Sequence, residues 1–283
     1  MPSRELAERF SAVGMIRSEY LLREINQSIT VASARQRVAD YTRAVARLFA
    51  PAPVWYRTSE FTTEEANVME GVDRRYVEAD FMKGRRGLRR ALELPAAFDL
   101  ELRTVAEVAR DLPNLHILVP FVRDADDFGF AVDALERAGW PNGFGSMVEI
   151  PSALLEIEKF VSAGATNLTL GLNDLTSLLI GTSRQDGDHK LHPSLWWAVD
   201  TLAAAVGSRC EWGIAGNLAT PVLARAEQAK PDYVSLHYHE LPTLIGIAPS
   251  ELPDLGHVAR TKELTRRRIA RYHSERRGSD PPV

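Results

Sequence analysis

Two carboxylates stand at the ends of two short apolar segments. Glu149 ends the segment 145–149 and Asp174 follows the run 168–172, with an amphipathic segment, 153–163, between them. This order predicts a strand, a helix and a second, parallel strand, whose carboxyl ends lie at the same edge of a sheet. Two carboxylates at one edge suit Mg2+, which prefers oxygen ligands and leaves other positions to water and substrate. The alternative is that both acids only end a strand or cap a helix.

Arginine supplies nearly all of the positive charge, and several arginines stand near predicted strand ends. Arg17 lies in the strand-like segment 13–22, Arg57 follows the apolar run 54–56, and Arg86 lies where a helix is predicted to begin. The planar guanidinium group can bind phosphate or carboxylate through two parallel hydrogen bonds. These arginines indicate an anionic ligand, although a surface ion pair or a compositional bias towards arginine would also explain any one of them.

Two histidines follow the last predicted strand. Ser235, His237 and His239 alternate along the segment that begins at Tyr233, so their side chains are expected on one face. Both histidines would lie near the carboxyl end of that strand, where an imidazole could transfer a proton. The alternative is two histidines at the rim with no role in chemistry.

Strand-like and helix-like segments alternate along the chain. The apolar run 115–122 is typical of a strand buried in a parallel sheet, and the apolar spacing over 32–49 predicts a helix with one buried face. We expect an α/β fold, a (β/α)8 TIM-type barrel, with residues 1–283 in one domain. Residues 1–12 should hold an N-terminal helix and residues 250–283 a C-terminal helix and tail. The active site of such a barrel lies at the carboxyl ends of its strands, where these polar residues collect: Arg17, Arg57, Glu149, Asn173, Asp174, Asn217 and His237.

The composition limits the classes of protein to consider. With 283 residues, 45% of them hydrophobic, the chain can bury one large core, and its net charge of −4 does not suggest nucleic acid binding. Cys210 is the only cysteine, which excludes an intramolecular disulfide and indicates a reducing compartment. No apolar run reaches membrane-spanning length and no signal-peptide core is found at the start, so we expect a cytoplasmic protein. The arginine-rich segment 260–277 is expected to be a solvated helix on the barrel rather than a contact with nucleic acid or membrane.

Taken together, the motifs resemble the C-terminal barrel of the PEP-utilising enzymes, the domain that binds phosphoenolpyruvate (PEP) in PEP synthase, pyruvate phosphate dikinase and Enzyme I of the sugar phosphotransferase system. The likeness covers about residues 12–245, and several motifs follow in the order of that family, which makes the set more specific than any one of them. The matching segments are Gly14-Met-Ile-Arg-Ser-Glu-Tyr-Leu21, Tyr56-Arg-Thr-Ser-Glu60, Asp80-Phe-Met-Lys-Gly-Arg-Arg-Gly87, Met147-Val-Glu-Ile-Pro-Ser152 and Asn173-Asp-Leu-Thr176.

The resemblance implies a role for each matching residue. Glu149 and Asp174 would bind Mg2+, and Asn173 would donate a hydrogen bond to the phosphate. Four arginines would hold the phosphate and carboxylate groups of PEP: Arg17, Arg57, Arg86 and Arg184.

Three features depart from the family pattern. The Gly-x-Cys-Gly motif, whose cysteine exchanges a proton with the methyl carbon of pyruvate, appears here as the segment 213–216, with Ala215 in place of the cysteine. Cys210 lies too far along the same strand to replace it. The chain also lacks the ATP-grasp and phosphohistidine domains. The family's first strand is missing as well, so the barrel closes in an unusual way, or the N-terminal segment or another subunit covers the gap.

These features leave three hypotheses for the function. The first is an enzyme, transferase-like or lyase- and aldolase-like, that binds PEP, pyruvate or a related 2-oxo acid and works through a metal-stabilised enolate without the cysteine. His237 or His239 would then supply the proton, or the enolate carbon would be captured by another group. The second is phosphotransfer with separate ATP-grasp and phosphohistidine proteins, and the third is a non-catalytic PEP sensor or scaffold. In each case we expect a homo-oligomer with a small-molecule ligand and with neither a membrane nor a nucleic acid as partner.

Overall fold

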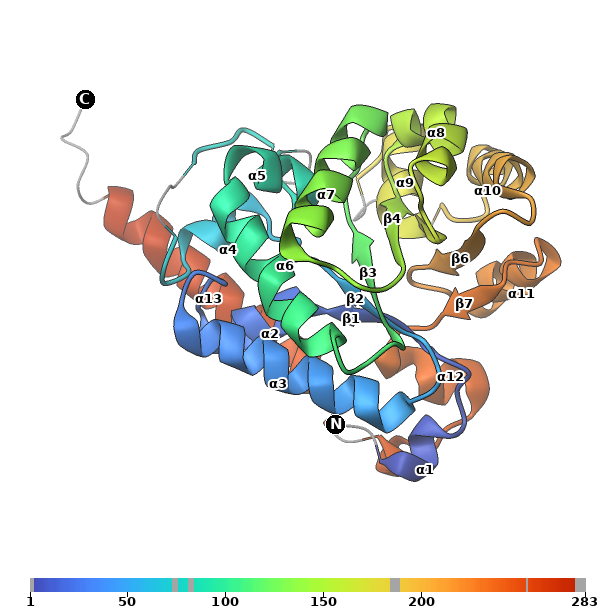
Figure 1. Ribbon diagram of the computed structural model, residues 1–283. Coiled ribbons are helices and arrows are strands. Elements are labelled where there is room, and N and C mark those ends of the chain that lie inside the picture. The colour runs from blue at the N-terminus through green and yellow to red at the C-terminus, as the bar shows by residue number, and fades with distance from the viewer. Residues whose placement is uncertain (1–2, 73–75, 81–83, 184–188, 253, 278–283) are drawn as a thin grey trace.

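The computed structural model describes residues 3–72, 76–80, 84–183, 189–252 and 254–277. In these residues, seven strands form one sheet, and each strand pairs in parallel with the next in the chain. The sheet curves into a nearly closed barrel with helices around it (Figure 1). The predicted α/β barrel in one domain is therefore confirmed, with seven strands in the described residues rather than eight: β1 (Val13–Arg17), β2 (Val54–Arg57), β3 (Leu115–Val119), β4 (Phe144–Val148), β5 (Asn167–Gly171), β6 (Glu211–Ala215) and β7 (Tyr233–Ser235).

Helices and short 3-10 turns connect the strands and cover the outside of the barrel (Figure 1). Several begin at residues typical of helix starts; Asp124, for example, accepts a hydrogen bond from the N–H of Asp127 at the start of α7. The helices and turns in the described residues are α1 (Arg4–Ala7), α2 (Ser18–Ile25), α3 (Ala32–Phe49), α4 (Thr63–Asn67), α5 (Gly87–Glu93), α6 (Pro95–Ala109), α7 (Ala125–Ala138), η1 (Pro151–Glu156), α8 (Ile157–Ser162), α9 (Leu172–Ile180), α10 (Pro193–Val206), α11 (Thr220–Gln228), η2 (Tyr238–Glu240), α12 (Leu241–Ile245), η3 (Pro249–Glu251) and α13 (His257–Arg277).

Each strand divides its side chains between the helical shell and the barrel interior, as the alternation of a strand requires. On β3, Leu115 and Ile117 belong to the main hydrophobic core, whereas Leu118 belongs to a small separate cluster with Trp55 and Met147. The main core accounts for most of the buried apolar surface. The inner cluster fills the middle of the barrel, so the open space lies at the carboxyl ends of the strands.

Some predicted boundaries are wrong because a strand can end while the sequence stays apolar. The segment 13–22 was expected to be a strand throughout, but it turns into α2 at Ser18, and β7 ends at Ser235 rather than continuing to Tyr238. The N-terminal helix covers only Arg4–Ala7. Leu6 of this helix and Phe10, which lies after its end, pack in a second hydrophobic cluster with Leu241, Ile247 and Leu252.

The two edge strands, β1 and β7, close the barrel by direct contact. In the described chain no ladder pairs them, yet a Cβ atom added to Gly14 would lie 2.7 Å from Oγ and 2.8 Å from Cβ of Ser235. An eighth strand between them would need about 9–10 Å, twice the usual spacing of neighbouring strands. In the described residues the barrel thus nearly closes with seven strands, and a glycine is required where β1 and β7 meet.

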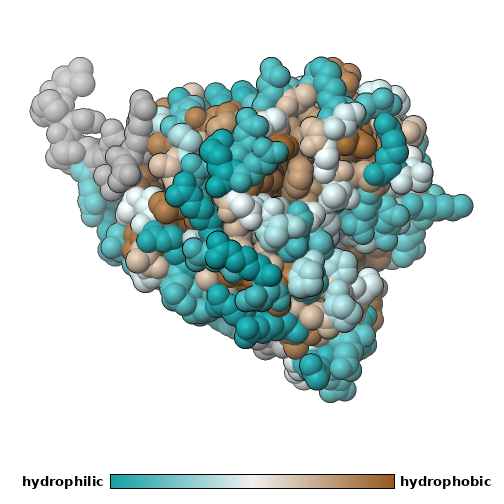
Figure 2. Space-filling model, viewed as in Figure 1, coloured by the Kyte–Doolittle hydropathy of each residue, from teal (hydrophilic) through white to brown (hydrophobic). Residues whose placement is uncertain are grey.

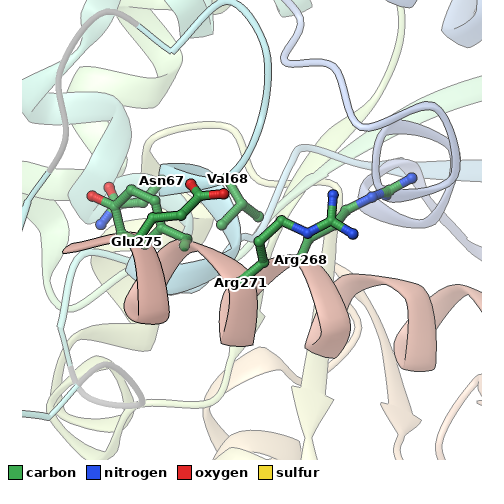
Figure 3. A pocket seen from close by; sticks show the side chains of 6 residues that line it. Asn67, Val68, Arg268, Arg271 and Glu275 are labelled. Atoms are coloured by element: carbon green, nitrogen blue, oxygen red, sulfur yellow. The ribbon is translucent and has the colours of Figure 1, made fainter. Parts of the chain in front are cut away.

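The last helix, α13, runs across α2 and α4, and the side chain of Arg268 donates to the carbonyl oxygen of Arg23 at 2.7 Å. A shallow depression of about 210 Å3 lies between α4 and α13 and is lined by Asn67, Val68 and Arg271, among others (Figure 3).

On the face seen in Figure 2, hydrophilic side chains predominate over α3. None of the helices among the described residues is long and apolar enough to cross a membrane.

The contact between β1 and β7 predicts a specific steric effect. Gly14→Ala should reduce the free energy of unfolding by about 1–3 kcal/mol, the usual cost of overpacking, because its Cβ would overlap the side chain of Ser235. Ser235→Gly in the same chain removes both overlapping atoms and should restore much of the loss. Denaturant unfolding of the two single variants and the double variant measures this.

A matched control is Gly129→Ala on α7, where nothing lies within 4 Å of the added Cβ. It should be neutral or stabilising, since alanine favours a helix over glycine. A Gly14→Ala variant as stable as wild type would show that the strands do not meet in this way.

Candidate functional site

A cavity of about 690 Å3 opens at the carboxyl ends of the strands and continues along the contact between β1 and β7. It brings together most of the residues singled out in the sequence. His239 is exposed and does not line it, and Arg184 lies outside the described residues. The candidate residues that line the cavity are Arg17, Arg57, Arg86, Glu149, Asn173, Asp174 and His237.

The first two arginines are held by buried glutamates. Arg17 Nε donates to Glu19 at 3.0 Å, Arg57 bonds to the same carboxylate, and Arg57 also pairs with Glu60 at 2.6 Å. Burial opposes the ionisation of Glu19, but the charges of Arg57 and Arg17 outweigh it and lower the pKa of Glu19. Both glutamates were missed as site residues, although they are the acids of the motifs that carry Arg17 and Arg57. Their role as partners depends on the turn after each strand.

The third arginine extends this series to the second predicted metal ligand. Arg86 pairs with Glu60 and reaches Asp174 Oδ1 at 3.3 Å. Burial works against the charge of Glu60, yet Arg57 and Arg86 lower its pKa to about 2. The described site therefore contains a series of alternating guanidinium and carboxylate groups, buried in the middle and partly exposed at both ends. We call it the charge chain: Arg17, Glu19, Arg57, Glu60, Arg86 and Asp174.

Two backbone features place Arg86. Gly87, the next residue, has φ +47°, and a Cβ on it would lie 2.7 Å from the carbonyl oxygen of Pro120. Only glycine allows this approach, which brings the guanidinium carbon of Arg86 to 4.1 Å from the ring centre of Phe121. The glycine at position 87 thus allows Arg86 to lie against Phe121 at the start of α5.

The pKa of Glu149 is strongly perturbed. It is 2% exposed, and its Oε1 accepts a hydrogen bond from the N–H of Phe121 at 2.9 Å. Burial, followed by the negative charges of Glu60 and Asp174, raises the pKa of Glu149 to about 8. Without a bound metal ion this carboxyl group is therefore mainly protonated at neutral pH, even with Arg57 and Arg86 nearby.

Asn173 and Asp174 lie in the first turn of α9, directly after β5. The side-chain oxygen of Asn173 accepts a hydrogen bond from the N–H of Asn217 at 3.2 Å. This contact orients the amide so that its NH2 group, a donor, is turned away from the loop after β6. Asn173 is thus arranged to donate to an acceptor.

No group suited to proton transfer stands at the position of Ala215. Ala215 ends β6, is 6% exposed and pairs with Ser235 of β7. His237 lies in the cavity, but burial, with the nearby His239 and Arg17, lowers the pKa of His237 to about 3. At neutral pH His237 is therefore uncharged. Cys210 precedes β6, at the opposite end of the barrel.

A buried glutamate behind the site supports two of the arginine motifs. Glu101 of α6 accepts hydrogen bonds from Tyr56 Oη at 2.7 Å, from Ser59 N at 2.9 Å and from Ser18 Oγ at 3.2 Å. Ser18 follows Arg17 and Ser59 lies two residues after Arg57 in the chain. One side chain thus fixes the turns after β1 and β2 relative to each other.

The sequence comparisons agree with this geometry. A family model described as "PEP-utilising enzyme, PEP-binding domain" matches residues 3–222. A probable phosphoenolpyruvate synthase of Methanocaldococcus jannaschii is 31% identical over 199 residues, 64% of this chain and 17% of its own length. The phosphoenolpyruvate synthase of Pyrococcus furiosus is 29% identical over 199 residues, 64% of this chain and 24% of its own length. This chain thus spans about a fifth of the length of these curated relatives.

The similar solved structures are more distant in sequence. A HpcH/HpaI aldolase from Desulfitobacterium hafniense DCB-2 has a TM-score of 0.48 and 11% identity, covering 85% of this chain and 92% of its own. A HpcH/HpaI aldolase/citrate lyase family protein from Burkholderia cenocepacia J2315 has a TM-score of 0.47 and 16% identity, covering 82% of each chain.

The raised pKa of Glu149 predicts how stability depends on pH. Between its ordinary pKa of 4.5 and the folded value of about 8, the folded chain binds a proton that the unfolded chain does not. The contribution of Glu149 to folding therefore weakens as pH rises through this window, by on the order of a few kcal/mol. Glu149→Gln should be less sensitive to pH between 6 and 9 in urea unfolding without divalent cations.

Glu107→Gln, at an exposed position on α6, is the control and should follow wild type. Identical pH profiles for wild type and Glu149→Gln would show that Glu149 is ionised in the folded protein at neutral pH.

Proposed function

This chain belongs to the PEP-utilising enzymes through their PEP-binding domain, and we propose that it binds PEP, pyruvate or a related 2-oxo acid with Mg2+. The observation that supports this is the convergence of three arginines with Glu149 and Asp174 in one cavity at the carboxyl ends of the strands. Several guanidinium groups and one divalent cation are a suitable set to neutralise a small ligand that carries both phosphate and carboxylate.

Glu149 and Asp174 are the residues that would hold the metal. Each presents hard oxygen atoms, both line the same cavity, and the charge of Asp174 contributes, after burial and Glu60, to the raised pKa of Glu149. The described residues include no set of three His, Cys, Asp or Glu side chains around a metal position. Mg2+ often uses one or two carboxylates, with substrate and water completing its shell. When bound, it supplies positive charge that offsets the charge developing on the 2-oxo oxygen.

The arginines are paired but still have donors to offer. Arg57 is 4% exposed, and in the described part of the chain its Nε has no hydrogen-bond partner. Arg17 is the more accessible, with a third of its side chain exposed. We infer that an incoming phosphate or carboxylate shares these guanidinium groups with Glu19 and Glu60, and that Asn173 donates its amide hydrogens to the phosphate.

The absence of an acid at Ala215 limits which reactions this site could catalyse. Ala215 cannot exchange a proton with the enolate carbon, so an enzyme that forms an enolate here needs another group to react with that carbon. This group is either a neutral His237 or a second substrate, as in lyase- or aldolase-like chemistry. Phosphotransfer would need separate proteins that carry the ATP-grasp and phosphohistidine domains. A PEP sensor is the second candidate, because Ala215 and the low pKa of His237 weaken proton transfer while leaving the binding groups intact.

Ligand binding tests the metal site directly. In isothermal titration calorimetry with Mg2+, wild type should bind oxalate, an analogue of the pyruvate enolate, and PEP. Glu149→Gln and Asp174→Asn should each weaken binding at least about tenfold, which corresponds to about 1.4 kcal/mol. Asp200→Asn, an exposed acid on α10, is the control and should leave affinity unchanged. Unchanged affinity in both site variants would rule out this metal site.

Proton exchange separates the enzyme from the sensor. Ala215→Cys should restore Mg2+-dependent exchange of the methyl protons of pyruvate with deuterated solvent, followed by NMR, since a general acid or base contributes about 10²–10⁴-fold. If wild type already exchanges these protons and His237→Ala or His239→Ala abolishes this, a histidine performs the transfer. If neither wild type nor Ala215→Cys exchanges protons although oxalate binds, the chain is better described as a sensor.

A further inference from the structure

The same cavity extends well beyond the charge chain, and its second part is lined by apolar and aromatic side chains together with Glu24, Arg37, Asp254 and His257. From the carboxyl ends of the strands it continues beside the contact of β1 with β7 to the inner face of α3 and the segment after β7. We call this part the seam groove. The apolar and aromatic side chains that define it are Leu6, Phe10, Tyr41, Val45, Phe49 and Leu236.

The seam groove follows from the way the barrel closes. A parallel barrel of eight strands would have a further strand and helix between β7 and β1, whereas here the two edges touch at Gly14 and Ser235. Helix α3 turns one stripe of side chains towards this region, because Tyr41, Val45 and Phe49 are spaced four residues apart. The groove is therefore a consequence of the seven-stranded closure, with a helix face as one of its walls.

A polypeptide strand does not fit as the occupant of the groove. The contact of Gly14 with Ser235 leaves no space for a polypeptide strand between the two edge strands, so a ligand tail must lie beside this contact, against α3 and the segment after β7. The groove and the charged site are parts of one cavity, which favours a ligand that occupies both parts.

The total volume is large for a three-carbon acid. Cavities of about 300–1,000 Å3 are typical for ligands of drug size, and this one measures about 690 Å3. PEP or pyruvate would occupy only the end with the arginines and carboxylates. The remaining apolar surface would gain most from a hydrocarbon chain or ring, since burial of apolar area in such a groove is favourable.

Small residues connect the two parts. Gly171, Ala215 and Ser235 are register partners across β5, β6 and β7. A Cβ on Gly171 would lie 2.7 Å from Glu149 Oε2, so this row begins beside the predicted metal ligand. It ends at Gly14, in the seam. A substituent on the carbon next to the 2-oxo group could therefore pass Ala215 into the groove, where the larger cysteine of the family would narrow the path.

We propose that the ligand of this site is a 2-oxo acid, or its phosphoenol form, whose third carbon carries an apolar chain or ring that lies in the seam groove. The proposal rests on the function proposed above, because the head group must bind to Mg2+ and the arginines. It adds the substrate class: a long-chain or aryl-substituted 2-oxo acid in preference to pyruvate itself.

A chain-length series tests this inference. Pyruvate, 2-oxobutanoate, 2-oxohexanoate and 2-oxooctanoate are titrated into wild type with Mg2+, with oxalate as a reference ligand that has no tail. The dissociation constant should fall about fourfold for each methylene group buried, from about 0.8 kcal/mol per group. The gain should continue over several carbons, because the cavity reaches from the charged site to Tyr41, Val45 and Phe49 of α3.

Two variants locate the tail. Tyr41→Ala and Phe49→Ala remove apolar wall from the groove and should flatten the chain-length gain while leaving oxalate affinity unchanged. The matched control is Phe130→Ala, which removes a similarly half-buried aromatic ring from α7, away from the cavity. It should preserve the gain. Thermal unfolding of all three variants shows whether each remains folded at the temperature of the titrations.

The outcomes distinguish the inference from the function on which it rests. If oxalate and pyruvate bind with Mg2+ but longer acids bind no better, the seam groove does not hold a tail and only this inference is wrong. If the gain survives in both groove variants, or if long acids bind equally well to Glu149→Gln, the tail lies elsewhere and the inference is also wrong. If neither oxalate nor any 2-oxo acid binds, the proposed function itself is overturned.

Discussion

The alternation of buried guanidinium and carboxylate groups is the constraint on which the site depends. A single charge in the interior of a barrel is costly, and breaking one buried pair leaves its partner uncompensated. In the charge chain each arginine contacts a carboxylate, and Arg57 and Arg86 each contact two, so these side chains are extended and fixed before any ligand arrives. The charge chain also affects its neighbour: burial, followed by the negative charges of Glu60 and Asp174, raises the pKa of Glu149.

Much of this arrangement could be predicted from the sequence because parallel strands place their carboxyl ends together. The convergence of Arg17, Arg57, Glu149 and Asp174 needs only the order of strands and helices, which the apolar periodicity supplies. Glu19 and Glu60 could not be assigned as partners in this way. Their contacts depend on tight turns after β1 and β2, and a turn is determined by side chains from distant segments, such as Glu101 of α6.

The closure of the barrel shows another limit. We expected the family's first strand to be absent, but several solutions remained open, including a covering segment from elsewhere. Which one applies is determined by the absence of a side chain at Gly14, a steric detail that acquires meaning only once Ser235 is known to lie opposite. The early end of β7 has a similar origin, because the chain after Ser235 turns to pack Leu241 against Leu6.

Phe121 ties the electrostatics of the site to one backbone conformation. Its N–H serves Glu149, its ring lies against Arg86, and its φ of +58° is one that residues other than glycine rarely adopt. The two functions make opposite demands. Glycine would relax the backbone and remove the ring, whereas a β-branched residue would keep apolar bulk at the expense of the conformation that aims the N–H. Phe121 thus limits which substitutions can separate the guanidinium group of Arg86 from the carboxyl group of Glu149 during evolution. To replace Phe121 and keep both contacts, the whole β3–α7 connection would have to change.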